Sequence, residues 1–321
     1  MSFLRKALHL VLFGSSMIMY SQYTDVINSN RPGESMGAFA VGKTIFQTEL
    51  GVSYIREDHN LLGYKASGYF TDIDLRYGFL LEELEFIADI QYRKDTYEAP
   101  FADPLERSAL KNTIFGFKYL FYDPFKNYKE TVNVYSWKAN QKFKWRQLIP
   151  AVSLYAGANL VFSNNVFTFE GDPILSPKMM IILQNHFSGG WVFVTNIIAD
   201  RITTDYPTVG GIFTVTKSFN EKWSGFAEYQ AYQSDYYADI LVRGGAAYLV
   251  NDNLQLDVSV GKNFKDTPDI FYGGIGLSWR IALNYKDVIL FDDIKDNTEN
   301  KDKKSEEKQE ETIEETQTPQ E

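Results

Sequence analysis

The stretch LQLDVSV at residues 254–260 alternates strictly between apolar and polar side chains. Leucine and valine occupy every even position, whereas Gln, Asp and Ser occupy the odd ones. Successive side chains of a β-strand point to opposite faces, so this period of two predicts a strand with one apolar and one polar face. Residues 84–93 repeat the pattern, with Glu, Asp and Arg opposite a face of Leu, Phe, Ala, Ile and Tyr.

Similar segments recur along the chain and predict about twelve strands. We place them at 44–56, 69–77, 84–93, 112–122, 148–162, 178–187, 191–203, 208–219, 223–233, 239–250, 254–260 and 269–283. A tilted strand of about 9–11 residues spans a bilayer, and single-chain bacterial barrels have an even number of strands. The sequence therefore predicts an all-β protein, a transmembrane antiparallel up-and-down β-barrel over residues 44–283.

A soluble β-sandwich alternates in the same way and is the main alternative. Two features favour the membrane barrel: aromatic residues end the broad apolar faces, as in interfacial girdles, and the opposite faces carry charges of both signs, as in a wet or salt-bridged lumen. The candidate lumen residues are Glu49, Asp72, Asp74, Arg76, Glu85, Asp89, Arg93, Lys118, Glu228, Asp239, Arg243, Asp257 and Arg280. These charges could select a solute, or they could form a fixed salt-bridge network that fills a narrow barrel.

Both ends of the chain differ from the barrel. Arg5 and Lys6 precede an apolar stretch at 7–20 that is too short to span a membrane, which predicts a secretory signal peptide at 1–21; an amphipathic helix is the alternative. Residues 292–321 hold twelve acidic and five basic residues, and we expect 284–321 to be an acidic disordered tail in the periplasm. The tail could contact a periplasmic partner or merely aid solubility.

The connections between predicted strands alternate in length. Short turns at 80–83, 220–222 and 251–253 contrast with long loops at 94–109 and 163–177. Outer-membrane barrels place short turns in the periplasm and long loops outside, and an even number of strands puts both chain ends in the periplasm.

One connection breaks this rule. Residues 123–146 fall on the short-turn side, although they are long and rich in Tyr, Trp, Lys and Asn. They predict either a periplasmic insertion or a hairpin that the alternation does not reveal.

Four segments resemble a known family. NSNRPGES at 28–35 resembles the T-D-R-P-D-x-T/S opening of outer-membrane proteins named after the meta-pathway of phenol degradation, and KTIFQTELG at 43–51 is similar to the G-x-x-Q-x-E-x-G strand that follows it. GFKYL at 116–120 and IPAVSL at 149–154 resemble two later strands. The chain departs from the pattern at Asn30, at 123–146 and in its tail. The resemblance implies an outer-membrane barrel described as a transporter, often encoded near aromatic-degradation pathways.

Residues 22–43 precede the first predicted strand and carry the candidate gating residues Asn30, Arg31, Pro32 and Gly33. Pro32 and Gly33 favour a turn, and Arg31 can reach acidic lumen side chains such as Glu49, Asp72 or Asp74. We predict a plug that folds into the barrel; the alternative is a periplasmic leader that caps the barrel end or has no fixed structure. A barrel of about twelve strands is wider than one of eight, which only side chains fill, and narrower than an open porin of 16–18.

Catalysis has little support in the sequence. Asn185, His186 and Ser188 superficially resemble the Ser/His/Asn site of outer-membrane phospholipases, but neighbouring positions on one strand point to opposite faces. His59 lies beside two acidic residues in a region that predicts a solvated loop rather than a metal site. The sequence therefore predicts no enzyme, cofactor or metal.

The favoured functional hypothesis is a passive outer-membrane channel for small, apolar or aromatic solutes. Its expected partners are outer-membrane lipids and the solute, and the net charge of -10 argues against nucleic acid. The rival hypothesis is a non-conducting structural or interaction barrel with a plugged lumen. A third, an outer-membrane lipid hydrolase, would need Ser or Asp within hydrogen-bond reach of His186.

Overall fold

The computed structural model describes residues 26–126, 135–136, 142–162, 165–168, 172–235 and 238–282. The predicted signal peptide at 1–21 and the predicted tail at 284–321 lie outside these ranges. Within the described ranges, no helix has the length and apolar character needed to cross a membrane.

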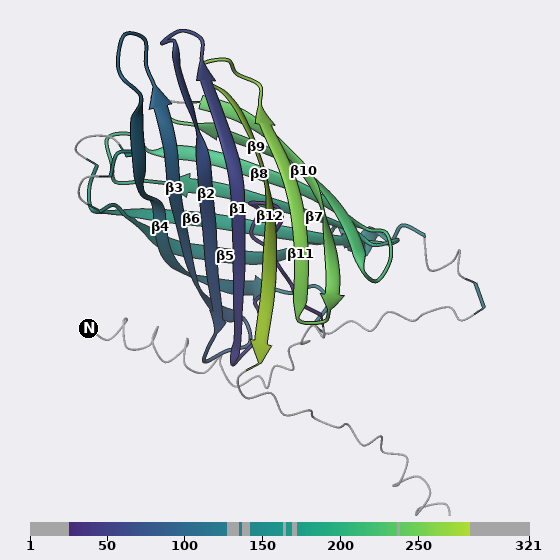
Figure 1. Cartoon of the computed structure of the whole chain (residues 1–321). Helices are drawn as coiled ribbons and strands as arrows, with labels where there is room; N and C mark the ends of the chain where they lie inside the picture. The colour runs from purple at the N-terminus through teal and green to yellow at the C-terminus, as the bar shows by residue number, and fades with distance from the viewer. Residues whose placement is uncertain are drawn as a thin grey trace, which may run out of the picture. The chain divides into compact units, whose positions relative to one another are not determined.

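Twelve strands form one closed barrel, in which each strand pairs with its neighbours in sequence and β1 pairs with β12 (Figure 1). All the pairings are antiparallel. The strands are β1 Ile45–His59, β2 Tyr64–Gly78, β3 Leu84–Glu98, β4 Leu105–Tyr122, β5 Ala151–Leu160, β6 Leu175–Phe187, β7 Trp191–Asp200, β8 Thr208–Ser218, β9 Trp223–Gln233, β10 Ala238–Asn251, β11 Leu254–Asn263 and β12 Asp269–Ala282. The predicted all-β, up-and-down barrel of about twelve strands is confirmed.

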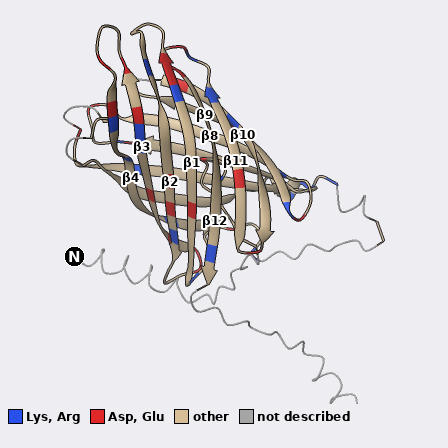
Figure 2. Ribbon diagram, viewed as in Figure 1, with Lys and Arg blue, Asp and Glu red and all other residues tan. Residues whose placement is uncertain are grey.

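Side chains alternate between the inside and the outside of the barrel. On β11, Asp257 and Ser259 are buried inside, whereas Val258 and Val260 are 49% and 53% exposed on the outer surface. Figure 2 shows that most of the strand length carries no charged residue. Many large apolar side chains are exposed on the strands, which matches the hydrocarbon core of a bilayer rather than water. The protein is therefore a membrane-spanning β-barrel of the outer-membrane type.

Aromatic side chains gather where strands meet the short turns. Trp191 begins β7, Trp223 begins β9 and Trp279 lies near the end of β12, and each is between 42% and 50% exposed. Amphipathic rings favour the membrane–water interface, so these residues mark one border of the apolar band.

Several strands are longer than the alternation predicts. The predicted long loop at 94–109 is wrong, because β3 continues to Glu98 and β4 begins at Leu105, paired with Tyr97. The apolar–polar alternation stops at Lys94, but the inner face continues as polar residues, because Asp95 is buried in ion pairs with Arg93 and Arg107.

The connection at 123–146 lies only partly within the described residues. β4 pairs directly with β5, so no undetected hairpin separates them in the barrel wall. A 3₁₀ helix, η1 Trp145–Leu148, precedes β5, which begins at Ala151 rather than at residue 148. Pro150 stands just before the strand and has no N–H to donate to a ladder, which explains the later start.

The outward orientation of β11 makes a prediction about stability. Replacing Val258 with Arg should lower the free energy of unfolding by about 2–4 kcal/mol, because the charge would face hydrocarbon at mid-strand. Val250→Arg, at the turn end of β10, should cost about 0–1 kcal/mol. Guanidinium unfolding of both variants in lipid vesicles measures the difference, and equal costs would contradict the proposed membrane-facing surface.

Candidate functional site

Residues 26–43, which we call the lumenal segment, lie inside the barrel ahead of β1. Side chains from eleven of the twelve strands bond to it. They are Glu49 of β1, Arg76 of β2, Glu85 of β3, Lys118 of β4, Ser153 of β5, Gln184 of β6, Asn196 of β7, Glu228 of β9, Arg243 of β10, Asp257 of β11 and Ser278 of β12. The segment is thus held from almost the full circumference of the lumen.

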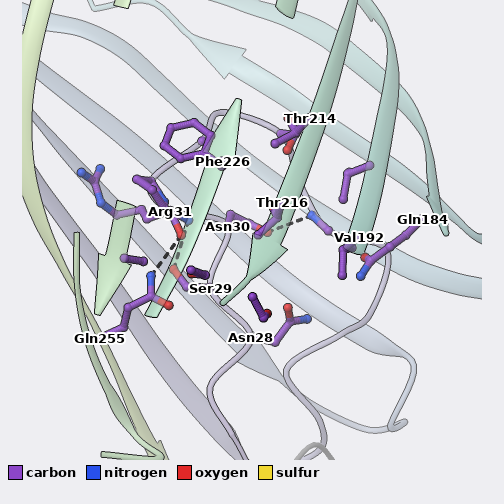
Figure 3. Close-up of a pocket in the computed structure, with 18 of the residues that line it drawn as sticks. Asn28, Ser29, Asn30, Arg31, Gln184, Val192, Thr214, Thr216, Phe226 and Gln255 are labelled. Carbon is purple, nitrogen blue, oxygen red and sulfur yellow. Dashed lines mark hydrogen bonds between the residues drawn. The ribbon is translucent and has the colours of Figure 1, made fainter. Parts of the chain in front are cut away.

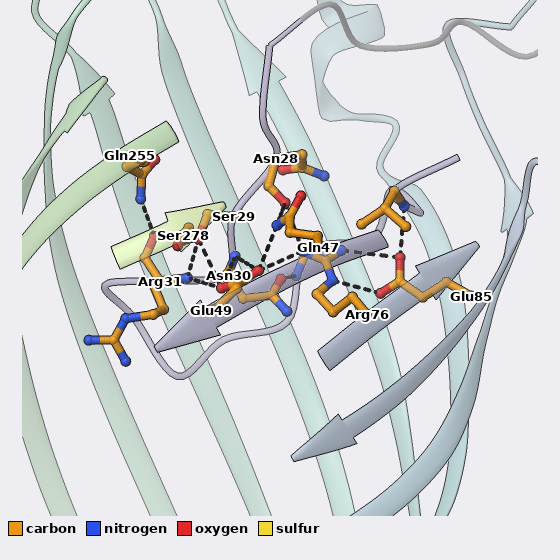
Figure 4. Close-up of polar contacts among 12 residues, drawn as sticks. Asn28, Ser29, Asn30, Arg31, Gln47, Glu49, Arg76, Glu85, Gln255 and Ser278 are labelled. Carbon is orange, nitrogen blue, oxygen red and sulfur yellow. Dashed lines mark hydrogen bonds and ion pairs between the residues drawn. The ribbon is translucent and has the colours of Figure 1, made fainter. Parts of the chain in front are cut away.

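Glu49 is the first anchor of this segment (Figure 4). Its carboxylate accepts hydrogen bonds from the backbone N–H groups of Asn30 and Arg31 at 3.1 and 3.0 Å, and from the Ser29 hydroxyl at 2.9 Å. Arg76 adds a donor at 3.0 Å. Glu49 is fully buried, so these donors replace the water that a carboxylate would otherwise need.

Arg31 lies flat against the wall between β1, β12 and β11. Its guanidinium forms a two-point ion pair with Asp257, at 3.1 and 3.3 Å. Gly51 and Gly276 are cross-strand partners under the guanidinium, and a Cβ atom at either would lie within 2.3 Å of it. A side chain at either position would therefore displace the guanidinium from its place against the wall. Burial lowers the pKa of Arg31, but the carboxylates of Asp257, Asp72 and Glu34 together raise it by more, so the guanidinium stays charged.

Glu228 is the second anchor, on β9. It accepts the backbone N–H groups of Glu34 and Ser35 at 3.0 and 3.1 Å and the Thr214 hydroxyl of β8 at 2.7 Å. The Glu34 carboxylate pairs with Arg243, although 49% of its side chain stays exposed within the barrel. Burial raises the pKa of Glu34, but Arg243, Arg31 and Lys178 together lower it by more, so Glu34 is an anion at neutral pH.

A third set of charges holds the end of the segment nearest β1. Glu85 accepts the backbone N–H of Val41 at 2.8 Å and pairs with Arg76 and Lys118 at 2.9 and 3.2 Å. Lys118 also donates to two carbonyl groups of the segment, those of Gly37 and Phe39. Glu85, Arg76 and Lys118 form, with Glu49, one buried network of four charges along β1 to β4.

The other predicted lumen residues lie elsewhere inside the barrel. Asp72, Asp74 and Asp89 line a cavity of about 70 Å³ together with Asn30, Arg31 and Gly33 of the segment. Three more lie away from the segment and have local partners: Arg93 pairs with Glu57 and Asp95, Asp239 accepts a bond from Asn263, and Arg280 donates to Asn253. Pro32 sits between the two anchors and lines a different cavity.

That larger cavity has a volume of about 270 Å³ (Figure 3). The lumenal segment forms one side of it, and strands β6 to β11 form the other. Its lining is mostly uncharged and includes Asn28, Gln184, Thr214, Phe226 and Gln255. The lumenal segment therefore separates a neutral polar cavity from the smaller one lined by three aspartates.

Comparison with protein families decides the identity of this barrel. The sequence pattern of the family described as "Putative MetA-pathway of phenol degradation" matches residues 29–281. The chain belongs to this family. The match begins at Ser29, so it includes most of the lumenal segment as well as the barrel. A comparison with curated protein sequences gives no match.

Several solved structures are similar to this family member at low sequence identity. An outer membrane channel from Pseudomonas putida F1 is 10% identical, with a TM-score of 0.48, over 79% of this chain and 100% of that one. The translocator domain of the autotransporter NalP from Neisseria meningitidis is 8% identical, with a TM-score of 0.45, over 78% and 90%. The Pseudomonas putida toluene transporter TodX is 9% identical, with a TM-score of 0.40, over 83% and 99%.

Sequence reasoning missed the uncharged members of the site. Gln184 accepts the backbone N–H of Ala38 at 2.8 Å, Ser153 donates to the carbonyl of Ala38 at 2.6 Å, and Asn196 both accepts from and donates to the backbone of Met36. A search for charged residues passes over such side chains. The position of Gln184, Ser153 and Asn196 on the polar face of a strand was the feature of the sequence that could have identified them.

The histidines take no part in a catalytic arrangement within the described residues. His186 bonds to Gln184 at 2.8 Å, whereas Asn185 and Ser188 both bond to Gln147. His59 accepts a backbone N–H within its own turn. The part of the chain that the structure describes contains no cluster of three or more His, Cys, Asp or Glu residues suited to a metal.

The Arg31–Asp257 ion pair leads to a prediction about stability. Arg31→Met should lower the free energy of unfolding by about 3–5 kcal/mol, because it leaves a buried carboxylate without its partner. Adding Asp257→Asn should recover much of that loss. Guanidinium unfolding in vesicles measures the cycle, with Lys43→Met at the exposed end of the segment as the matched control. A loss no greater than that of the control would contradict the pairing.

Proposed function

We propose that the protein is a passive outer-membrane channel whose lumen is closed by the lumenal segment and opens when that segment shifts. The observation that carries the proposal is the attachment of the segment to eleven strands through side chains. A twelve-stranded barrel lies between the filled eight-stranded barrels and the open porins, so one short segment is enough to close it.

The proposed solutes are small and apolar or aromatic. Family membership supports this class, since the family is described by a pathway of phenol degradation. The size of the larger cavity is compatible with it, because a cavity of about 150 Å³ already holds a benzene ring and this one has about 270 Å³. We propose no cofactor and no chemical step.

In the proposed orientation, the lumenal segment enters the barrel from its periplasmic end. Ile45 of β1 pairs with Ala282 of β12, so both chain ends leave the barrel at the same end. The turns at 80–83, 220–222 and 251–253 also lie at that end, and short turns face the periplasm in this class of protein.

A structural barrel that does not conduct remains the rival proposal. It is favoured by the buried network of Glu49, Arg76, Glu85 and Lys118, which fills one side of the lumen. The two proposals differ in whether the segment can leave its place.

Single-channel conductance of the refolded mature protein tests this difference. Deleting residues 23–42 should raise the conductance severalfold, because it removes the segment that separates the two cavities. No conductance in either form would exclude the channel and favour the structural barrel. Equal conductance in both forms would mean that the segment does not close the lumen.

A reversible crosslink gives a sharper test. The hydroxyl oxygens of Ser29 and Ser278 lie 2.7 Å apart, and the chain contains no cysteine, so Ser29→Cys/Ser278→Cys creates one unique disulfide between segment and wall. Oxidation should suppress the conductance, and a reductant should restore it. The single Ser29→Cys variant is the control and should not respond. Unchanged conductance of the oxidised double variant would contradict gating by the segment.

A further inference from the structure

The 123–146 connection is unusual in composition for a turn on the short-turn side. It holds six basic and two acidic residues, and six aromatic residues among 24. The channel proposal assigns it no role. The structure describes residues 123–126, 135–136 and 142–146 of it, together with the 3₁₀ helix that follows.

The C-terminal part of this connection is fixed to the turn between β6 and β7. Ser188 in that turn donates to the carbonyl of Lys142 at 3.2 Å and accepts from Gln147 at 2.6 Å. Asn185 donates to the carbonyl of Gln147 at 3.0 Å. Three hydrogen bonds therefore hold residues 142–147 against the rim of the barrel.

This attachment places aromatic rings on the outer surface. The Phe143 ring is stacked on Phe187 with centroids 6.4 Å apart, and Phe187 contacts Phe193, which contacts Phe213. The last three face outward from β6, β7 and β8. Gln184, Val194 and Thr214 lie an odd number of positions from them on the same strands and are buried inside. Phe143 thus extends a row of rings that begins on the lipid-facing wall.

The same stretch exposes further apolar side chains. Trp145 is 81% exposed, Phe143 54% and Leu148 49%. In water this surface would be costly, but it is continuous with the apolar band of the barrel at its aromatic border. Its position therefore fits the interfacial region of the membrane.

One basic side chain contacts the same turn, and further basic residues lie close to it in the chain. Lys217 of β8 donates to the carbonyl of Gly189 and lies over the ring of Trp191 at 5.1 Å, and the backbone of Lys142 bonds to Ser188 one residue away. Lys144 follows two residues later in the chain, whereas Arg146 donates to the carbonyl of Pro124 at 2.8 Å. Positive charge beside exposed rings is the combination that binds anionic lipid headgroups at a membrane surface.

We propose that residues 142–149, with Lys217, form an interfacial anchor that binds the headgroups of anionic phospholipids at the short-turn face of the membrane. The rings enter the headgroup–acyl boundary, and the lysines contact the lipid phosphates. This anchor depends on the membrane-facing surface of the barrel and not on the proposed channel activity.

Lipid selectivity tests the proposal. The full mature chain is refolded into vesicles, and electron paramagnetic resonance measures how strongly spin-labelled phosphatidylglycerol and phosphatidylcholine associate with it. Lys142→Gln/Lys144→Gln/Lys217→Gln should reduce the preference for phosphatidylglycerol at least threefold. The control is Lys65→Gln/Lys94→Gln/Lys262→Gln, which removes three exposed lysines at the opposite rim. An unchanged preference in the first variant, or an equal loss in the control, would overturn the proposal.

The depth of Trp145 provides a second, independent readout. The difference in fluorescence between the natural protein and Trp145→Phe reports on Trp145. Lipids brominated near the headgroup should quench this part of the fluorescence most strongly. Quenching of that part by aqueous iodide alone would place Trp145 in water, overturn the membrane anchor and favour a protein partner for this surface.

Discussion

Buried carboxylates on the inner wall are the constraint on which the lumen depends. Glu49, Glu85, Glu228 and Asp257 are each at most 6% exposed, and an ionised group in such a place is stable only with several donors around it. The wall supplies some of these donors through Arg76 and Lys118. The backbone N–H groups and the guanidinium of the lumenal segment supply the others, so wall and segment complete each other.

The segment meets this requirement without adding a strand to the sheet. The barrel is already closed, so its strands have no free edge to offer, and the N–H groups of the segment turn to Glu, Gln and Asn side chains instead. Gly51 and Gly276 show that the wall also accommodates the segment, because the absence of side chains there leaves space for the Arg31 guanidinium. The segment therefore has a defined path through the lumen, set by side chains that alternation directs inward.

The residues that line the lumen were largely predictable from the sequence, because the alternation of apolar and polar residues shows which side chains point inward. The pattern on β11 was enough to place Asp257 on the polar face, and the same argument applied to Glu49, Arg76 and Glu85. It could not tell which partner each would have, since that depends on strand register and on the path of the segment. Glu34 was not singled out because it lies in no strand, and the 123–146 connection carries no period at all. Arg31 was expected to reach a lumen carboxylate, but its partner, Asp257, lies 226 positions away in the chain.

The charges also indicate how the segment would leave. On the β1–β4 side, Glu49 would keep Arg76, and Glu85 would keep both Arg76 and Lys118, so that network stays paired. On the opposite side, Asp257 would lose Arg31, its one ion-pair partner among the described residues, and Arg243 would lose Glu34. The ion pairs that withdrawal breaks are thus on β10 and β11, whereas Glu49, Glu85 and Glu228 lose backbone donors. A solute that offered a hydrogen-bond donor to Asp257 or an acceptor to Arg243 would replace the partner that each of these charges loses.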